Sequence, residues 1–114
     1  MSPDHAEALV RRCFDSYRTA DRSAIEALLH PDFTFTSPRD DHIGRDAYFE
    51  RCWPAAGTFA VQDLKTVVPD GSGGCFVLYE GRAKAGWGFR NVEQFRFADG
   101  RIVSVEVFFG REPG

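Results

Sequence analysis

The last quarter of the chain has the pattern of a β-hairpin with one buried face. Residues 87–98 alternate in character, so that aromatic side chains fall on one face of a strand and arginines on the other. Asp99-Gly100 then leads to a second strand at 101–109, and Asp-Gly is a favoured hairpin turn. Exposing the aromatic rings would cost far more than exposing the arginines. The chain must therefore build an antiparallel sheet that is covered on one side.

Two polar residues, Asn91 and Glu93, fall on this buried aromatic face. A carboxylate on an apolar face must be paired, hydrogen-bonded or protonated, because burying an isolated charge is expensive. Two interpretations follow. Glu93 either bonds a buried tyrosine, arginine or backbone amide and holds the core together, or it lies in a wet pocket. The second makes Glu93 a candidate catalytic residue and Asn91 a candidate ligand contact.

The first half of the chain is mainly helical in pattern. Apolar residues at helical spacing predict a first helix that starts near residues 2–4, with either Ser2 or Asp4 as its N-cap. A capping box of Ser23 and Glu26 predicts a second helix, which Pro31 ends. Together with the strands, these helices predict an α+β domain. The remaining elements that we expect are a strand at 33–37, a loop at 38–44, a helix at about 45–53 and strands at about 59–68 and 75–85.

Bulk properties narrow the classes of function. The 114 residues suit a single domain, 1–114, and the net charge of −3 comes without a basic stripe, so we expect no nucleic-acid partner. No apolar run approaches the roughly 20 residues that span a bilayer, and the N-terminus lacks the pattern of a signal peptide. Cys13, Cys52 and Cys75 are widely spaced, which predicts reduced thiols in a cytoplasmic protein without a zinc site. Motifs for nucleotides or catalytic metals are absent, so we expect no cofactor.

Three segments of the chain resemble the SnoaL-like proteins of the nuclear-transport-factor-2-like superfamily. They are AIEALLHPDFTFTSP (24–38), IGRDAYFERCW (43–53) and VEQFRFADGRIVSVEVFFG (92–110), the last being most similar to ketosteroid isomerase. The resemblance covers nearly the whole chain. It implies a cone: a curved, mainly antiparallel sheet wrapped by about three helices, with an internal pocket. It also implies a homodimer. The family includes isomerases, cyclases, dehydratases, epoxide hydrolases and non-catalytic binders, so the resemblance indicates a fold more than a function.

Ketosteroid isomerase uses an aspartate base, with a tyrosine and a protonated aspartic acid as its oxyanion hole. The resemblance places the protonated acid on Glu93, the base on Ser37 and the tyrosine on Cys13. Serine alone is no base at neutral pH, and a thiol is a weak donor. We therefore do not expect steroid isomerisation by that mechanism. A paired-acid epoxide hydrolase would need two inward acids bracketing an arginine, and only Glu93 has a clear inward position.

The polar segment 37–42 is the other candidate for chemistry, since it lies near where the family's pocket opens. His42 could act as a general base oriented by Asp41 or Asp40. Alternatively, the segment is a solvated loop in which an aspartate caps the next helix or bonds backbone amides. The pocket contacts that we expect are Ser37, Asn91, Phe35, Tyr17, Tyr48, Trp53, Phe89, Val105 and Phe109, with Phe33, Phe95 and Val107 as further walls; the tyrosines and tryptophans fit a packing role equally well.

These observations predict a domain that binds a small apolar or aromatic oxygenated molecule. As an enzyme it would carry out cofactor-free isomerisation, cyclisation or dehydration beside a carbonyl, with Glu93 as acid, base or polariser and His42 or Asp41 as its partner. The alternative is a non-catalytic module that dimerises or binds a partner through the outer face of its sheet. An open, wet cavity around Glu93 would favour the first function. An interior plugged by Trp53 and Trp87 would favour the second.

Overall fold

The computed structural model describes residues 2–110, which fold into one six-stranded sheet and three α-helices. The elements are α1 (Pro3–Arg18), α2 (Arg22–Leu28), β1 (Leu29–Ser37), β2 (Asp40–Gly44), α3 (Arg45–Arg51), the 3₁₀ turn η1 (Trp53–Ala55), β3 (Phe59–Pro69), β4 (Cys75–Ala83), β5 (Gly88–Ala98) and β6 (Arg101–Phe109). This α+β architecture confirms the predicted fold class.

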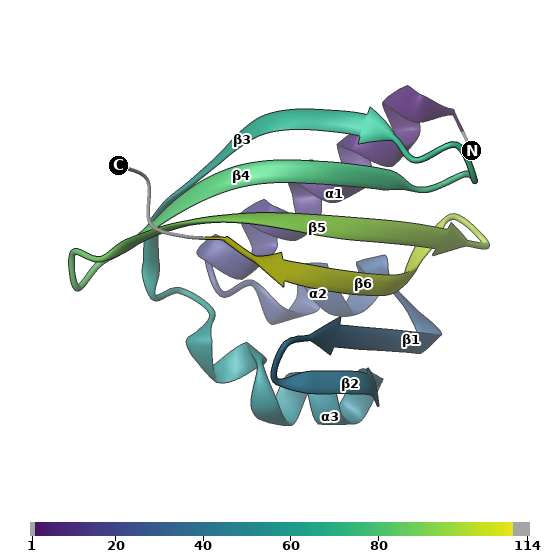
Figure 1. Cartoon of the computed structure of the whole chain (residues 1–114). Helices are drawn as coiled ribbons and strands as arrows, with labels where there is room; N and C mark the ends of the chain where they lie inside the picture. Colours follow the sequence, from purple (N-terminus) through teal and green to yellow (C-terminus); the bar gives the residue numbers. More distant parts are fainter. Residues whose placement is uncertain (1, 111–114) are drawn as a thin grey trace.

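The sheet has the order β2-β1-β6-β5-β4-β3, and it bends so that its inner face partly encloses the helices (Figure 1). Neighbouring strands are antiparallel except β1 and β6, which run parallel where the β1–β2 hairpin of the first half joins the strands of the second half. The helices lie on one side of the sheet only. The inner face is therefore covered, as the aromatic alternation requires.

The helix caps decide between the predicted alternatives. Ser2, not Asp4, is the N-cap of α1, and its side chain accepts a backbone hydrogen bond from the first turn. The cap of α2 was wrongly predicted at Ser23. Asp21 takes that role instead, and its carboxylate accepts from the amide of Ala24 at 3.1 Å. An aspartate three residues before that amide is an equally good N-cap, so the helix starts earlier.

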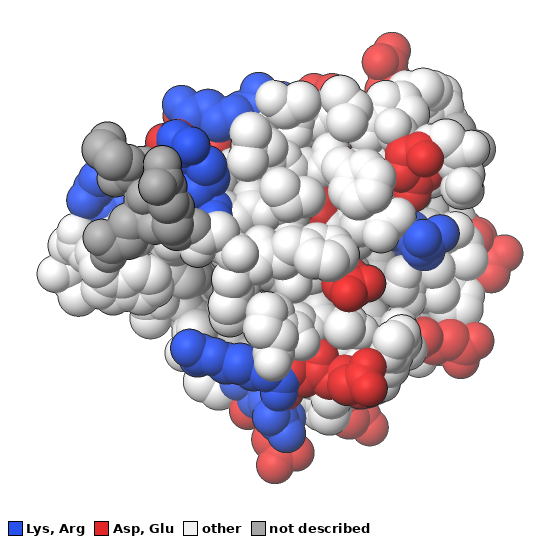
Figure 2. Space-filling model, viewed as in Figure 1, with Lys and Arg blue, Asp and Glu red and all other residues white. Residues whose placement is uncertain are grey.

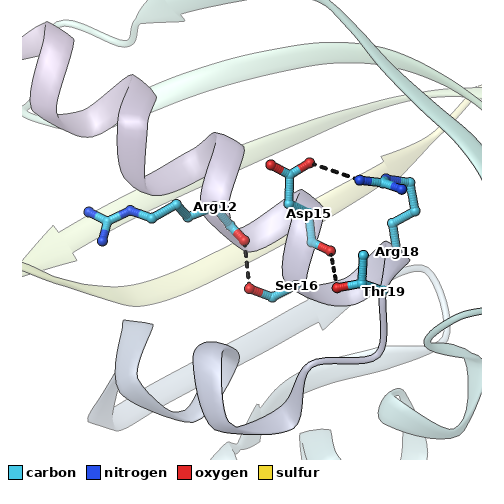
Figure 3. A network of polar contacts seen from close by, with 5 residues as sticks. All are labelled: Arg12, Asp15, Ser16, Arg18 and Thr19. Carbon is cyan, nitrogen blue, oxygen red and sulfur yellow. Dashed lines mark hydrogen bonds and ion pairs between the residues drawn. The ribbon is translucent and has the colours of Figure 1, made fainter.

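The end of α1 is closed by side chains that bond back to the helix (Figure 3). Ser16 Oγ donates to the carbonyl of Arg12 at 2.7 Å, and Thr19 Oγ1 donates to the carbonyl of Asp15 at 2.8 Å. The guanidinium of Arg18 contacts the Asp15 carboxylate at 3.5 Å. The hydroxyl bonds add to the backbone ladder, since the Asp15 carbonyl also accepts from the amide of Thr19 at 3.0 Å.

The segment between α2 and α3 is more regular than predicted. The strand expected at 33–37 already begins at Leu29, and the expected loop at 38–44 contains the strand β2. Pro31 fits inside β1 because the pairing with β6 is interrupted between Leu29 and Thr34, where no ladder bond is needed. The hairpin of β1 and β2 turns at Pro38 and Arg39.

The core lies between the inner face of the sheet and the helices. Its fully buried large side chains are Phe33, Phe95, Ile25, Leu29, Ile102, Val10 and Val77. Strict alternation along β6 places Ile102 on the outer face, and this prediction is wrong. A register shift pairs Arg96 with Ser104 but Phe97 with Ile102, so the strand carries one extra residue and Ile102 turns inward.

The outer face of the sheet is left without a covering layer among residues 2–110. It carries a group of apolar side chains, which we call the outer-face patch, on four neighbouring strands: Val68, Phe76, Leu78, Val92 and Phe108. Figure 2 shows this side of the molecule as a largely uncharged area with charged groups mainly around it. Among the same residues, every helix is too short or too polar to cross a lipid bilayer.

Candidate functional site

A cavity of about 180 Å³ lies between the inner face of the sheet and the helices. Its wall comes from α1, from α3 with the residue that follows it, and from every strand except β2. The lining residues are Cys13, Phe14, Tyr17, Phe35, Tyr48, Cys52, Phe59, Gln62, Tyr79, Phe89, Asn91, Glu93, Val107 and Phe109. Most of these side chains are apolar or aromatic, and the polar groups are few, which is typical of small-molecule pockets.

Strand β5 supplies the polar centre of the cavity. Phe89, Asn91 and Glu93 alternate along the strand and all line the cavity, while Phe95 continues the same face into the core. The predicted orientation of this face is confirmed for these residues. Trp87, which precedes β5, packs its ring against those of Phe59 and Phe89 on the same face, but it lies at the rim and is 52% exposed instead of buried.

Glu93 is held by a tyrosine from the neighbouring strand. Tyr79 Oη donates to Glu93 Oε2 at 2.5 Å. Asn91 Nδ2 in turn donates to the Tyr79 hydroxyl at 3.3 Å, and Asn91 Oδ1 accepts from the backbone of Gly110 at 3.1 Å. Among residues 2–110, the second carboxyl oxygen of Glu93 has no protein donor. One oxygen of Glu93 is thus fixed by the protein, and the other is available to a molecule in the cavity.

Two opposing effects set the pKa of Glu93. Burial disfavours the charged carboxylate and raises the pKa from 4.5 to about 7, although the hydrogen bond from Tyr79 works in the opposite direction. Near neutral pH, Glu93 is therefore present in both protonation states. It can give a proton to a ligand or take one from it without a large energetic penalty.

The other titratable groups of the cavity stay protonated at neutral pH. Burial, followed by the charge of Glu93, raises the pKa of Tyr79 and of Cys13 far above their ordinary values. Burial also raises the pKa of Tyr17, and it raises that of Cys52 to about 11. Thiols with raised pKa values are poor nucleophiles, because the thiolate is the reactive form. Among the cavity-lining residues, Glu93 is the group suited to move a proton near pH 7.

The cavity has a polar interior and an aromatic entrance. Tyr79 and Asn91 are only 4% and 9% exposed, whereas Phe109 at the end of β6 is 52% exposed. Phe59 and Phe89 lie close together, with ring centroids 5.3 Å apart, and both are partly exposed. A ligand with one polar end and an apolar body fits this gradient when its polar end enters first.

The structure brings part of the predicted site together. Seven of the predicted residues line the cavity: Glu93, Asn91, Phe35, Tyr17, Tyr48, Phe89 and Phe109. Five do not: Asp41, His42, Ser37, Trp53 and Val105. Tyr17 donates its hydroxyl to the carbonyl of Cys52 at 3.0 Å, so it also ties α1 to the segment after α3.

Asp41 and His42 lie on the outside of the edge strand β2. Their side chains are 90% and 72% exposed, and they contact each other, with 2.6 Å between His42 Nδ1 and Asp41 Oδ1. The predicted pairing of the imidazole with an aspartate is therefore present, but it faces solvent. The physical reason is that 40–44 pairs with β1 as a hairpin instead of forming a loop that reaches over the cavity. Asp40 pairs with Arg51 at 2.6 Å.

Ser37, Trp53 and Val105 have structural neighbours that keep them away from the cavity. Ser37 Oγ accepts from the amide of Arg39 in the turn between β1 and β2. Trp53 packs edge-on against Tyr17, with ring centroids 5.8 Å apart. Val105 is 5% exposed and lies in the core beneath the cavity. Trp53 therefore supports the wall and does not plug the interior.

Sequence reasoning missed Tyr79, Gln62 and Phe59 as lining residues. For Tyr79 the usable signal was its period-two spacing with Cys75 and Val77, which places all three on one face of β4, although Phe76 and Leu78 make the other face apolar as well. Gln62 and Phe59 had no such signal in the sequence. A bulge in β3 pairs Phe59 and Val61 with successive residues of β4, so that both Phe59 and Gln62 face inward. Cys13 and Phe14 line the cavity from α1, and Cys52 lines it from the C-cap position of α3.

No group of three or more metal-ligating side chains comes together among residues 2–110.

Comparisons with known proteins agree with this architecture. A family model for the SnoaL-like domain matches residues 10–105, most of the chain. The chain belongs to the SnoaL-like family. This membership covers both the helices and the strands that build the cavity. No curated protein matches the chain by sequence.

Several solved structures superimpose on most of the chain. A Kribbella flavida protein named a candidate ketosteroid isomerase has a TM-score of 0.79 at 18% identity, covering 97% of this chain and 82% of its own. An epoxide hydrolase from M. tuberculosis has a TM-score of 0.75 at 15% identity, covering 94% and 84%. An NTF2-like protein of unknown function from Burkholderia pseudomallei has a TM-score of 0.73 at 21% identity, covering 96% and 92%. At these identities, the SnoaL-like chain shares a fold with them.

Proposed function

We propose that this SnoaL-like domain binds a small, mostly apolar oxygenated molecule and catalyses proton transfer beside its carbonyl group. The observation that carries the proposal is the Glu93 carboxyl group. It faces an apolar cavity with one oxygen bonded to Tyr79 and a pKa of about 7. A carboxyl group in that state is suited to general acid–base work at neutral pH. The reaction class is isomerisation, cyclisation or dehydration without a cofactor.

In this proposal the bound carbonyl lies against the free oxygen of Glu93. The protonated carboxyl transfers its proton to the carbonyl oxygen, and this makes the hydrogens on the adjacent carbon more acidic. The carboxylate that remains takes a proton from that carbon, so that a neutral enol forms and Glu93 is protonated again. Glu93 then gives this proton to another carbon and takes back the proton of the enol oxygen, which restores the carbonyl. Tyr79 remains protonated and keeps the carboxyl oriented, and Asn91 keeps Tyr79 in place. Phe59, Phe89 and Phe109 hold the apolar body of the ligand.

The cavity lining argues against the chemistry of a paired-acid epoxide hydrolase. Such an enzyme needs two inward acids bracketing an arginine. The lining holds one acid, Glu93, and no arginine. The His42–Asp41 pair is exposed to solvent and does not line the cavity, so it supplies no second acid or base in this proposal. A single carboxyl that both delivers and accepts the proton is the simplest scheme that these residues support.

The test of this function starts with thermal-shift screening of ketones, lactones and aromatic acids, since a ligand of the folded state raises the melting temperature. Compounds that bind are then assayed for turnover with Glu93→Gln. We expect kcat to fall by at least about 100-fold, because general acid–base catalysis typically contributes that much or more. The control is Glu106→Gln on the outer face of β6. Unchanged turnover by Glu93→Gln would exclude Glu93 from the mechanism.

We also propose that the domain forms a homodimer through its outer-face patch. Phe108 and Val68 are 45% and 44% exposed there, and Phe76 is 36% exposed. Contiguous exposed apolar side chains mark interaction surfaces. This same observation favours the second candidate function, a non-catalytic dimerisation or partner-binding module. The two candidates differ at the cavity, since the module has no use for a carboxyl group with a free oxygen in an open interior. The three unpaired thiols support a cytoplasmic location.

A further inference from the structure

The amide of Gln62 is a polar group of the cavity wall that lacks a partner. Its Oε1 atom is buried, and no donor among residues 2–110 bonds it. Buried amide oxygens nearly always accept a hydrogen bond, because an unpaired one loses its bonds to water without replacement. Across the sheet, Gln62 faces Gly81, whose position is covered by the Phe89 ring and supplies no side-chain donor. The protein itself therefore leaves this amide to an outside group.

Gln62 and Glu93 lie on the same cavity wall but on different strands, β3 and β5. Gln62 aligns with Gly81 and Phe89 across the sheet, and Glu93 lies four residues beyond Phe89 on β5. In a flat sheet these offsets would separate the Cα atoms of Gln62 and Glu93 by about 16 Å. Both side chains extend into the cavity from these positions, so the gap between their polar atoms is shorter. Between them lie the aromatic rings of Tyr79 and Phe89.

We infer that Gln62 is a specificity-determining residue that selects ligands with a hydroxyl group at the end opposite their carbonyl. The inference rests on the proposed function, in which Glu93 contacts the carbonyl. A hydroxyl is suited to this position because it can donate to Oε1 and accept from the amide nitrogen, whereas an ether or ketone only accepts. The terminal torsion of glutamine rotates easily, so Oε1 can turn toward the ligand.

The substrate class that follows is a hydroxy-substituted ketone with a flat or compact apolar body. A site that hydrogen-bonds a ligand hydroxyl rejects the analogue that lacks it, because a buried polar group is then left unpaired. Gln62 would supply this discrimination at one end of the cavity while Glu93 carries out the chemistry at the other. The aromatic middle of the cavity contributes affinity for the apolar body without distinguishing the two analogues.

The experiment compares acetophenone, 4-hydroxyacetophenone and 4-methoxyacetophenone as probes, with binding measured by isothermal titration calorimetry at pH 6. These ketones differ only in the group opposite the carbonyl. For the natural sequence we expect 4-hydroxyacetophenone to bind about tenfold more tightly than the other two, as one good hydrogen bond allows. In Gln62→Leu we expect the three affinities to become equal within about twofold, with acetophenone bound as before. Gln94→Leu, the same change on the outer face, should keep the preference.

A second measurement separates a ligand role of Gln62 from a structural one. Gln62→Leu replaces an unpaired buried oxygen with apolar atoms, so its melting temperature should equal or exceed that of the natural sequence. A clear loss of stability would mean that the amide holds the fold, and would overturn the inference. So would acetophenone binding without a hydroxyl preference, or a preference that survives Gln62→Leu; both leave the proposed function standing. If none of the three ketones binds the natural sequence, this inference fails, whereas the proposed function is decided by the wider screen of ketones, lactones and aromatic acids.

Discussion

At the scale of single residues, Glu93 combines two features that are rarely found together in a packed interior. Its carboxyl group is buried enough for its pKa to rise to about 7, yet one of its oxygens has no protein partner among residues 2–110. A purely structural glutamate would have both oxygens bonded, because an unpaired buried polar atom reduces stability. The cavity beside Glu93 explains how this arrangement is tolerated, since water or a ligand can reach the free oxygen.

The raised pKa of Glu93 should make stability fall as the pH rises. Between pH 4.5 and about 7, the folded state holds the Glu93 proton more tightly than the unfolded state. The stabilisation from this proton is fully present below pH 4.5 and is lost as the pH rises through about 7. Its size is at most about 3 kcal/mol. We expect Glu93→Gln to remove this dependence, so that its free energy of unfolding relative to the natural sequence rises from pH 4.5 to pH 8.

Urea unfolding at a series of pH values measures this difference. Glu106→Gln is the matched control, because Glu106 lies on the outer face of β6 and its replacement should leave the pH profile of the natural sequence in place. A difference between Glu93→Gln and the natural sequence that stays constant from pH 4.5 to pH 8 would contradict a raised pKa. It would also weaken the assignment of Glu93 as an acid–base group.

The sequence predicts the orientation of Glu93 but not its partner. Alternation along 87–97 is enough to place Glu93 among aromatic residues, since only one face of that strand can be buried. Its bond to Tyr79 depends on the register between β4 and β5, where Tyr79 lies opposite Asn91, two residues before Glu93 on the same face. The turn between these strands, around residues 84–87, does not fix that register from the sequence alone. The hydrogen-bond donor to Glu93 is therefore known only from the structure.

At the scale of elements, the errors in prediction occur where a strand departs from a period of two. The bulge in β3 turns Phe59 and Gln62 to the same side, and the shift between β5 and β6 turns Ile102 inward. A bulge adds one residue to a strand, so every assignment of faces beyond it reverses. Long alternating stretches without a bulge, such as 89–95, were assigned correctly. The bulges themselves have no marker in this sequence.

The start of α2 offers a direct test of a local rule. Asp21 accepts from the amide of Ala24, whereas Ser23 lies within the first turn and is exposed. We expect Asp21→Ala to lower the free energy of unfolding by about 1 kcal/mol, the usual contribution of an N-cap. Ser23→Ala should change it by less than about 0.5 kcal/mol. Urea unfolding of the two variants distinguishes them, and a larger loss for Ser23→Ala would show that the helix begins at Ser23 in solution.

At the scale of the whole molecule, the fold was easier to predict than the site. A cone needs a hairpin-rich sheet with one apolar face and helices to cover it, and both are visible as periodic patterns over many residues. The site needs the positions of single side chains from distant segments. Asp41 and His42 illustrate this difference, because a polar cluster near the end of a strand can face the interior or the solvent. The pairing of β2 with β1 leaves Asp41 and His42 exposed to solvent. The local sequence pattern does not predict this pairing.

The outer-face patch leads to a prediction about assembly. If two copies pack through this face, a charge placed at its centre must weaken the contact, because a lone buried charge is costly. Phe108 adjoins Val92 in the sheet and is 45% exposed, so Phe108→Lys should not disturb the fold of a single chain. We expect sedimentation velocity to detect a dimer of the 12.8 kDa chain and mostly single chains for Phe108→Lys. Ala8→Lys on the exposed side of α1 is the control that should remain dimeric.

This experiment also relates the patch to the cavity. The two surfaces lie on opposite faces of the same sheet, with Phe108 outward and Val107 and Phe109 inward on adjoining positions of β6. If the outer face serves assembly and the inner face serves ligand binding, Phe108→Lys should separate the chains and still bind a ketone found by thermal-shift screening. Loss of ligand binding together with the dimer would instead mean that packing of the sheet's outer face maintains the shape of the cavity. A single chain at every concentration of the natural sequence would contradict the proposed dimer outright.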